Sequence, residues 1–188
     1  MLEPEVALIG NPNSGKSTLF NRLTGANQHI GNWPGVTVER ISGECKLDEQ
    51  QINVVDLPGT YALGDDNADY SIDERIAQAA VSDGSSDLYL NIVDATNLGR
   101  HLFLTSQLCE RGVNMILVLN MADVAAKRKI PINTAALAQA LGCPVIAISA
   151  NTGEGIDALK QLVAERLAGP TEKLATAPFS LLTNITSA

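Results

Sequence analysis

The sequence has few cysteines and no cysteine pairs. Its 188 residues include three, Cys45, Cys109 and Cys143, which lie far apart and form no CxxC spacing. An odd, scattered set argues against a disulfide framework or a zinc site. The pattern predicts buried thiols in a reducing compartment.

Clustered basic residues and long apolar runs are also missing. The formal net charge is -8 and the pI is about 4.7. Surfaces that bind nucleic acid depend on clustered Lys and Arg, so no nucleic-acid partner is expected. No apolar run approaches the ~20 residues that cross a bilayer, and no signal-peptide pattern precedes the first predicted strand. These residues are therefore expected to form a soluble, cytosolic fragment.

Apolar runs alternate with helical patterns along the chain, which is typical of a mostly parallel sheet covered by helices. Strands are predicted at about 5–10, 36–47, 51–56, 88–94, 114–120 and 144–149. Helices are predicted near 16–24, 71–82, 98–111, 133–141 and 155–168. The second and third strands are joined by Asp48-Glu49-Gln50, which is too short for a crossover helix, so they should form an antiparallel hairpin.

The predicted architecture is a three-layer α/β domain of the P-loop NTPase type over residues 1–168. Its six-stranded sheet is mostly parallel, with one antiparallel hairpin strand. Residues 169–188 turn to Thr, Ala, Ser and Pro, with one apolar cluster at 179–182, and are predicted to be a linker or the truncated start of a following element. In such a sheet the loops after the strands gather at one edge, where ligands bind.

The segment Gly10-Asn11-Pro12-Asn13-Ser14-Gly15-Lys16-Ser17 matches the phosphate-loop pattern, between an apolar strand and an amphipathic helix. Gly10 and Gly15 allow a tight turn that brings backbone N–H groups close to a phosphate. Lys16 supplies a charge for the outer phosphates, and the Ser17 hydroxyl suits Mg²⁺. The predicted phosphate-binding residues are Gly10, Asn13, Ser14, Gly15, Lys16, Ser17 and Thr18.

Two further segments suit a site that senses the last phosphate of a nucleoside triphosphate. Asp56 ends an apolar strand, where it can hold Mg²⁺ through water, and the N–H of Gly59 can meet a terminal phosphate. The Gly- and Pro-rich stretch 25–37 is predicted to be a mobile loop and the first switch. Thr37 is its only hydroxyl able to join Ser17 on Mg²⁺.

The segments after the last two strands suit a guanine base. The Asp123 carboxylate can accept hydrogen bonds from the N1–H and amino group of guanine, two donors that adenine lacks on that edge. Asn120 should hold the phosphate loop to this segment. Further base-site residues are Met121, Ser149, Ala150 and Asn151, with a backbone N–H after the last strand facing the guanine carbonyl.

Taken together, these motifs resemble the five G motifs of the Ras-like GTPases, in order and over about residues 1–168. They are Gly10–Ser17, Thr37, Asp56–Gly59, Asn120–Asp123 and Ser149–Asn151. Four longer stretches are similar to the N-terminal G domain of the FeoB family of bacterial ferrous-iron transporters, within the TrmE-Era-type cation-activated class. They are Ile9–Ser17, Gly31–Glu39, Asp56–Tyr61 and Asn91–Leu98.

The resemblance implies a GTP switch that regulates Fe²⁺ uptake by cycling between GTP and GDP states. In such proteins a helical regulatory domain joins the G domain to a membrane domain, at the cytoplasmic face of the inner membrane. Neither domain is visible in this sequence. Self-association of the chain is left open.

The resemblance also implies how hydrolysis would proceed. Asn11 would ligate K⁺ together with backbone carbonyls around Gly31 to Trp33, and K⁺ would replace an arginine finger. Thr60 and Tyr61 occupy the region of the water-orienting Gln, so a low intrinsic rate is expected. The residues with catalytic roles are Asn11, Lys16, Thr37 and Gly59. Met121 and Asn151 stand where the common G motifs have Lys, and Asn151 is expected to loosen base binding.

Three alternatives compete with this interpretation. A GTPase assembly factor acting on RNA or ribosomes would share the fold, but the acidic chain lacks the basic face it needs. An ATPase is disfavoured by Asp123. A direct iron-binding module would use Asp65, Asp66, Asp69, Asp73 and Glu74, although such a run is better explained as a solvated loop.

Overall fold

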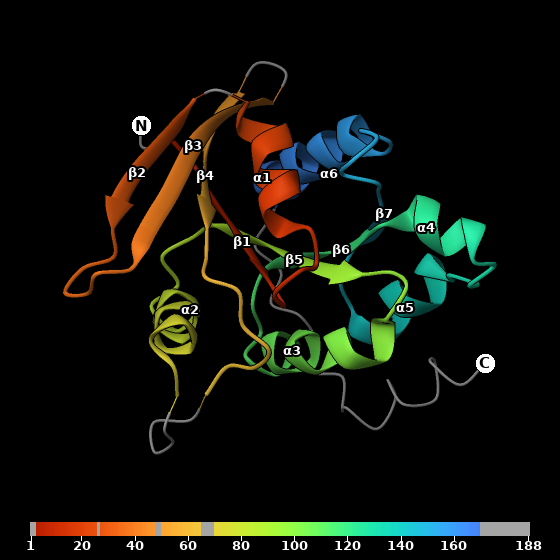
Figure 1. The fold of residues 1–188 in the computed structure, drawn as a ribbon. Helices are drawn as coiled ribbons and strands as arrows, with labels where there is room; N and C mark the ends of the chain where they lie inside the picture. Colours follow the sequence, from red (N-terminus) through yellow and green to blue (C-terminus); the bar gives the residue numbers. More distant parts are fainter. Residues whose placement is uncertain (1–2, 26, 48–49, 65–69, 170–188) are drawn as a thin grey trace.

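A seven-stranded sheet with helices on both faces makes up the protein (Figure 1). The structure is a computed structural model that describes residues 3–25, 27–47, 50–64 and 70–169. The strands are β1 (Glu5–Gly10), β2 (Gln28–Asn32), β3 (Glu39–Leu47), β4 (Gln50–Asp56), β5 (Leu88–Asp94), β6 (Met115–Asn120) and β7 (Val145–Ala147). The helices are α1 (Lys16–Thr24), α2 (Ile72–Ser82), α3 (Leu98–Glu110), α4 (Ala122–Lys127), α5 (Thr134–Leu141) and α6 (Ile156–Ala168).

The strand order is β2-β3-β4-β1-β5-β6-β7. Only β3 runs against its neighbours, pairing antiparallel with both β2 and β4, while the other described pairs are parallel. The carboxyl ends of β1, β4, β5 and β6 therefore meet at one edge of the sheet. The predicted three-layer fold and its hairpin strand are confirmed.

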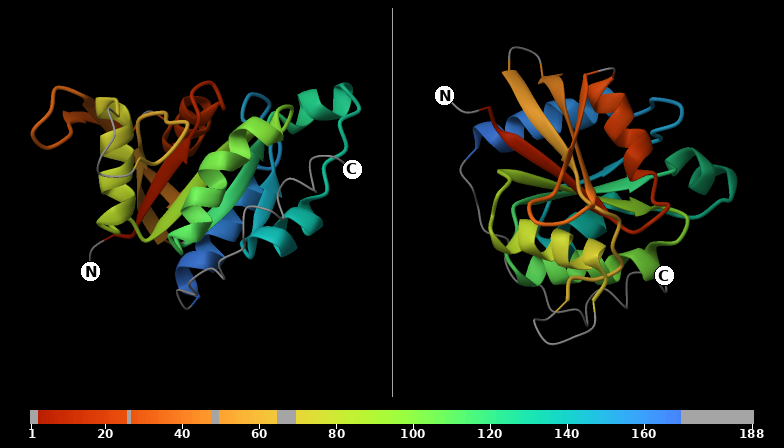
Figure 2. Two further views of the ribbon diagram at one scale, coloured as in Figure 1. Left: turned by 90° about the horizontal axis from the view of Figure 1, so that it is seen from below. Right: turned by 60° about the vertical axis from the view of Figure 1, so that its left-hand side comes forward.

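Two hydrophobic clusters fill the space on either side of the sheet. In β1, Val6 and Leu8 face the cluster formed with α1 and α6, whereas Ala7 and Ile9 face the cluster formed with α2, α3 and α5. This alternation is the period of two that a strand imposes, and both sets are apolar because helices cover both faces. The two further views show the same helices on opposite sides of the sheet (Figure 2).

The prediction of six strands was wrong by one. The stretch 28–32, predicted to be part of a mobile loop, forms β2 and pairs with β3 from Gln28↔Gly43 to Asn32↔Glu39. All five residues of β2 are exposed, so its composition carries no alternating apolar pattern. The short helix α4 was also not predicted, since its six residues are too few for a helical period.

The three thiols are free and buried, as predicted. Burial raises the pKa of Cys109 to about 11 and that of Cys143 to about 12, which keeps both in the unreactive thiol form. Among the described residues, no helix has both the length and the apolar character needed to span a membrane. The predicted linker begins at Gly169, and residues 170–188 lie outside the described part.

Candidate nucleotide-binding site

A cavity of about 580 Å³ opens at the edge of the sheet where β1 leads into α1. Most of its lining comes from the phosphate loop and the helix that follows. The lining residues are Asn11, Pro12, Asn13, Gly15, Lys16, Ser17, Thr18, Gly59, Asp73 and Met121. Pro12 and Asp73 were not among the residues predicted for nucleotide binding, although Asp73 was part of the iron-binding alternative. Asp73 enters from the first turn of α2, which no motif in the sequence indicated.

Close backbone approach explains the two glycines of the loop. A Cβ on Gly10 would lie 2.4 Å from the carbonyl oxygen of Ile92. Gly15 has a φ of 86°, and a Cβ there would lie 2.1 Å from the side-chain nitrogen of Asn120. Both positions therefore exclude a side chain.

The start of α1 provides free backbone donors. Gly15 is the N-cap, and no side chain caps the first turn. The first N–H groups of a helix have no intrahelical acceptor, and the helix dipole adds positive potential there. This end of α1 is therefore suited to bind the phosphates of a nucleotide.

Asp56 lies beside Lys16 and Ser17, two residues that line the cavity. The Lys16 ammonium forms an ion pair with the Asp56 carboxylate, and both side chains are about nine-tenths buried. Burial raises the pKa of Asp56, while the charge of Lys16 and hydrogen bonds from Lys16 and Ser17 lower it. Asp56 therefore takes up a proton at a higher pH than an exposed aspartate. Its carboxylate and the Ser17 hydroxyl are hard oxygen donors, which fit Mg²⁺.

Asn120 joins the phosphate loop to the segment after β7. Its side-chain N–H donates to the carbonyl of Ser14 at 2.9 Å, and its side-chain oxygen accepts from the N–H of Ala150 at 2.9 Å. The residue is buried, and both ends of its amide are used. The predicted bridging role of Asn120 is present in the structure.

Asp123 and Ser149 lie side by side beyond this bridge. The Ser149 hydroxyl accepts from the N–H of Asp123 at 3.0 Å. Hydrogen bonding to Ser149 is the main cause that lowers the pKa of Asp123, with smaller help from Val124 and Lys127. The carboxylate therefore stays ionised through the neutral range, as an acceptor for a base must.

One residue that holds this segment escaped prediction. Arg22 on α1 donates from Nε to the carbonyl of Ala150 at 2.9 Å and from a terminal nitrogen to that of Asn151. A hollow of about 330 Å³ lies beside Arg22 and shares Thr18 with the main cavity. Nothing in the local sequence marks this contact, because it joins positions about 130 residues apart.

Asn11 is the most unusual polar group of the site. It lines the cavity and is 2% exposed. Neither its side-chain oxygen nor its side-chain nitrogen has a hydrogen-bond partner within the described residues. A buried amide without partners is costly, so this side chain is suited to a ligand in the cavity. An unpaired amide oxygen fits a monovalent cation such as K⁺.

The predicted first-switch residues do not join the cavity. Gly31 and Thr37 are exposed, and Trp33 is half-buried against the cluster under α2, α3 and α5. None of the three is among the residues that line the cavity within the described chain. In this structure Thr37 is therefore not assembled with Ser17.

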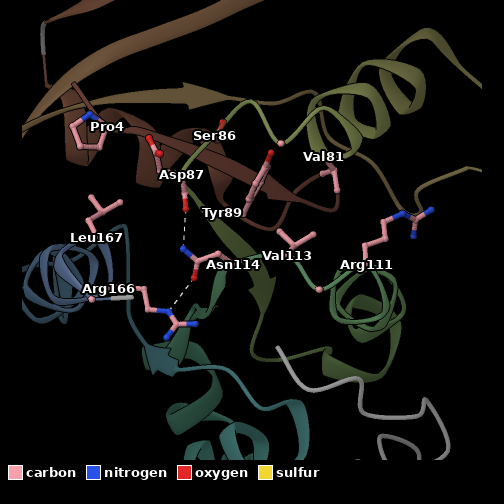
Figure 3. A pocket seen from close by; sticks show the side chains of 13 residues that line it. Pro4, Val81, Ser86, Asp87, Tyr89, Arg111, Val113, Asn114, Arg166 and Leu167 are labelled. Carbon is pink, nitrogen blue, oxygen red and sulfur yellow. Dashed lines mark hydrogen bonds between the residues drawn. The ribbon is translucent and has the colours of Figure 1, made fainter. Parts of the chain in front are cut away.

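A second cavity, of about 460 Å³, lies at the opposite edge of the sheet (Figure 3). Arg166 of α6 donates to the side chain of Asn114 at 3.0 Å, and Asn114 donates to the carbonyl of Asp87 at 2.8 Å. Tyr89, Val81 and Val113 form part of its wall (Figure 3). It contains no residue that the sequence assigned to nucleotide binding.

The phosphate loop, the Asn120 bridge and the segments that follow β4, β6 and β7 define a P-loop G domain. The chain belongs to the family described as Ferrous iron transport protein B, whose match covers residues 4–163. Membership of this family favours the ferrous-iron interpretation over the RNA assembly factor.

Curated relatives of this family match the chain over most of its length. The Fe(2+) transporter FeoB of Salmonella typhimurium is 52% identical over 155 residues, which is 82% of this chain and 20% of the transporter. That of Escherichia coli O157:H7 is 53% identical over the same shares. The chain thus spans about a fifth of the length of these relatives.

Solved structures show the same fold. The cytosolic domain of L. pneumophila FeoB is 47% identical with a TM-score of 0.83, covering 93% of this chain and 71% of that chain. The GDP form I of the cytosolic domain of the T. maritima FeoB iron transporter is 39% identical with a TM-score of 0.87, covering 93% and 67%.

The alternative of an iron-binding acidic module finds no support in the part of the structure that is described. Of its five residues, Asp73 and Glu74 begin α2, where Glu74 forms a capping box with Ser71. Asp65, Asp66 and Asp69 lie outside the described residues. No group of three or more His, Cys, Asp or Glu side chains suited to a metal ion occurs among the described residues.

Proposed function

We propose that this chain is the GTP-binding, slowly hydrolysing switch domain of a bacterial ferrous-iron transporter, cycling between GTP and GDP states to regulate Fe²⁺ uptake. The single observation that supports this most is the Asn120 bridge. It fixes the distance between the loop that would hold the phosphates and the segment that would hold the base. Residues 1–168 would form the G domain, and 169–188 a linker or the start of a following element.

In this proposal the phosphate loop and the start of α1 bind the α- and β-phosphates. Lys16 would exchange its ion pair with Asp56 for a contact with the outer phosphates, whose oxygens are also anionic. Ser17, Asp56 through water, and Thr37 would hold Mg²⁺, which when bound offsets the negative charge of the phosphates. The N–H of Gly59, beside Pro12 at the cavity, would meet the terminal phosphate.

Base recognition tests the first half of the proposal. Asp123 would accept two hydrogen bonds from guanine, each worth about 1.5–3 kcal/mol because the acceptor is charged. The Asp123→Asn variant should lose GDP affinity by about tenfold or more and gain affinity for xanthosine diphosphate, since an amide donates where a carboxylate only accepts. Titration of both nucleotides against both proteins measures this. Unchanged GDP affinity would place the base elsewhere.

Hydrolysis tests the second half. Neither Thr60 nor Tyr61 can orient water as a glutamine does, so turnover should be slow. We propose that K⁺ is bound by Asn11 together with carbonyls around Gly31 and Trp33, and stabilises the charge that develops during transfer. Because Gly31 and Trp33 lie outside the cavity here, the first switch must move to complete this shell.

Turnover of GTP in K⁺ and in Na⁺ buffers of equal ionic strength decides the K⁺ hypothesis. We expect at least about tenfold faster turnover in K⁺, which corresponds to one well-placed electrostatic contact. Asn11→Ala should remove the difference between the two salts. Asn53→Ala, which alters a half-buried asparagine outside the cavity lining, is the control and should keep it. Equal rates in both salts for the unsubstituted chain would refute the hypothesis.

The transport role concerns the longer protein that the relatives represent. We propose that a helical regulatory domain and a membrane domain are the partners there, at the cytoplasmic face of the bacterial inner membrane, with self-association left open. A full-length relative in which the residue equivalent to Lys16 is replaced by Ala should lose Fe²⁺ uptake while its abundance stays unchanged. Normal uptake would separate the switch from transport.

A further inference from the structure

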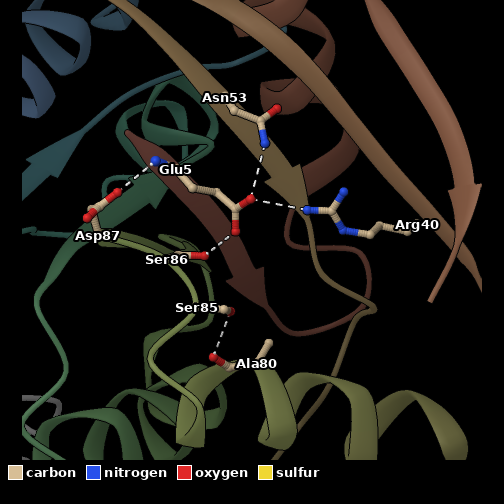
Figure 4. Close-up of polar contacts among 7 residues, drawn as sticks. All are labelled: Glu5, Arg40, Asn53, Ala80, Ser85, Ser86 and Asp87. Atoms are coloured by element: carbon tan, nitrogen blue, oxygen red, sulfur yellow. Dashed lines mark hydrogen bonds and ion pairs between the residues drawn. The ribbon is translucent and has the colours of Figure 1, made fainter. Parts of the chain in front are cut away.

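A cluster of polar contacts centres on Glu5, at the start of β1 (Figure 4). One carboxylate oxygen of Glu5 accepts from Arg40 at 3.1 Å and from the side chain of Asn53 at 3.1 Å. The other accepts from the Ser86 hydroxyl at 2.8 Å. The backbone N–H of Glu5 donates to the Asp87 carboxylate at 2.9 Å. Glu5 is therefore held by three donors, from β3, β4 and the segment before β5, and by one acceptor, the Asp87 carboxylate.

Arg40 connects this cluster to the first switch, because it contacts both Glu5 and Trp33. Its guanidinium group lies over the indole ring of Trp33, 5.4 Å from the ring centre. Arg40 and Glu5 are both partly buried, with side-chain exposures of 32% and 24%. The ion pair with Glu5 limits the positions that the Arg40 guanidinium can take. Glu5 therefore helps to keep the guanidinium over the Trp33 ring.

Trp33 begins the turn that contains Thr37. The N–H of Trp33 donates to the carbonyl of Val38 at 3.0 Å, which closes the turn between β2 and β3. The indole packs against the hydrophobic cluster under α2, α3 and α5, but its buried N–H has no hydrogen-bond partner within the described residues. Apolar packing and the Arg40 cation therefore hold the ring in place.

We infer that Glu5 and Arg40 are positioning residues for the Trp33–Val38 turn. They hold it in what we call the docked position, with Trp33 packed under Arg40 and the turn away from the nucleotide cavity. The inference rests on the proposed function, because it assigns regulation to that same site. In the docked position Thr37 is exposed and does not line the cavity. A triphosphate that recruits Thr37 must therefore draw the turn away from Arg40.

The Arg40–Trp33 contact should therefore affect GTP and GDP binding differently. A contact made only in the docked position stabilises that state, so it opposes any ligand that requires the other one. In the proposed function GTP with Mg²⁺ would recruit Thr37 to the metal, whereas GDP would not. Weakening the Arg40 contact should then favour GTP over GDP.

The first measurement uses the fact that Trp33 is the sole tryptophan of the chain. In the nucleotide-free protein, Arg40→Gln should raise the quenching of its fluorescence by acrylamide about twofold or more, because the ring loses its cover. Arg40→Lys, which keeps the charge, should restore most of the protection. Equal quenching in the unsubstituted chain and in Arg40→Gln would overturn the inference without reference to nucleotide binding.

The second measurement is the ratio of affinities for a non-hydrolysable GTP analogue and GDP, both with Mg²⁺. Arg40→Gln should shift this ratio toward the analogue by about three- to tenfold, the size expected from one partly exposed cation–π contact and ion pair. Glu5→Gln should shift it in the same direction by a smaller factor. The double variant should not exceed Arg40→Gln, since both act on one contact.

Arg111→Gln is the matched control, because it makes the same substitution at an exposed arginine that donates to the Gln107 carbonyl and, within the described part of the chain, contacts neither Glu5 nor Trp33. It should leave both measurements unchanged. An unchanged ratio in Arg40→Gln, or a shift toward GDP, would overturn the inference. Failure of the unsubstituted chain to bind either nucleotide would instead overturn the proposed function, and the quenching result would then decide alone whether Arg40 holds Trp33.

Discussion

The two sides of the candidate site are held in very different ways. The phosphate loop and the segments after β6 and β7 are joined by buried hydrogen bonds through Asn120, with Arg22 holding the far end. The first-switch turn is joined to the body of the protein through the Trp33 ring, its Arg40 cover and the exposed strand β2. The proposed switch would need this difference, because it would bind the diphosphate in both states and sense the last phosphate in only one.

The segment that follows β4, described as far as residue 64, lies between these extremes. Within it, the N–H of Thr60 donates to the carbonyl of Gly10 at 3.1 Å. Leu63 is tied to α3 in both directions, since its N–H donates to the Gln107 side chain at 2.8 Å and its carbonyl accepts at 3.0 Å. We therefore expect the first-switch turn to open at a lower free energy than the segment after β4, and that segment at a lower free energy than the phosphate loop.

The largest effect should come from breaking the rigid side at Gly15. Gly15→Ala places a Cβ at positive φ and against Asn120, so we expect a loss of GDP affinity of about 100-fold or more, close to 3 kcal/mol. Calorimetric titration measures it. Gly112→Ala is the control, because its φ is 64° but no atom lies within 4 Å of the added Cβ. Similar GDP affinities for the two variants would show that the close contact does not matter.

A smaller effect is expected at Asn120. Asn120→Ala leaves the carbonyl of Ser14 and the N–H of Ala150 without their partner, which should lower the free energy of unfolding by about 2–3 kcal/mol. Urea denaturation measures the change, together with a weaker GDP titration. Asn120→Asp keeps the acceptor for Ala150 but places a buried carboxylate oxygen against the Ser14 carbonyl, so its loss should be at least as large. Full stability in both variants would refute the bridging role.

The smallest effect should occur in the exposed strand β2. Ile30 is 71% exposed, so Ile30→Thr removes little buried apolar area and keeps a β-branched side chain. We expect the free energy of unfolding to change by less than about 0.5 kcal/mol, with GDP affinity unchanged. A loss above 1 kcal/mol, measured by urea denaturation, would mean that β2 is as firmly held as the central strands.

Much of the fold could be predicted because each central strand is a continuous apolar run in the sequence. The runs at 5–10 and 88–94 match β1 and β5 in full, and the helix predicted at 16–24 matches α1. The two strands are buried on both faces, so nearly every position in them is apolar and their boundaries fall at polar or glycine residues. The strand β2 could not be predicted in this way, because its pairing with β3 leaves every side chain exposed.

The residues of the candidate site also fall into two groups, those that local motifs indicate and those that only the tertiary structure brings to the site. Residues that act through the backbone or through one short motif, such as Gly15, Lys16 and Asn120, could be assigned from spacing. Arg22 and Asp73 could not, because they reach the site from other elements of the fold. Thr37 was assigned to the metal by its residue type, but the structure leaves it outside the cavity lining.

The sequence by itself determined the order of strands and helices and the chemistry offered at their ends, because burial and turn geometry restrict residue types locally. Only the tertiary structure decided which of those groups meet. The Asn120 bridge and the Glu5–Arg40–Trp33 contacts join residues that are distant in the chain, and such pairings depend on strand order and side-chain packing, which no local pattern records.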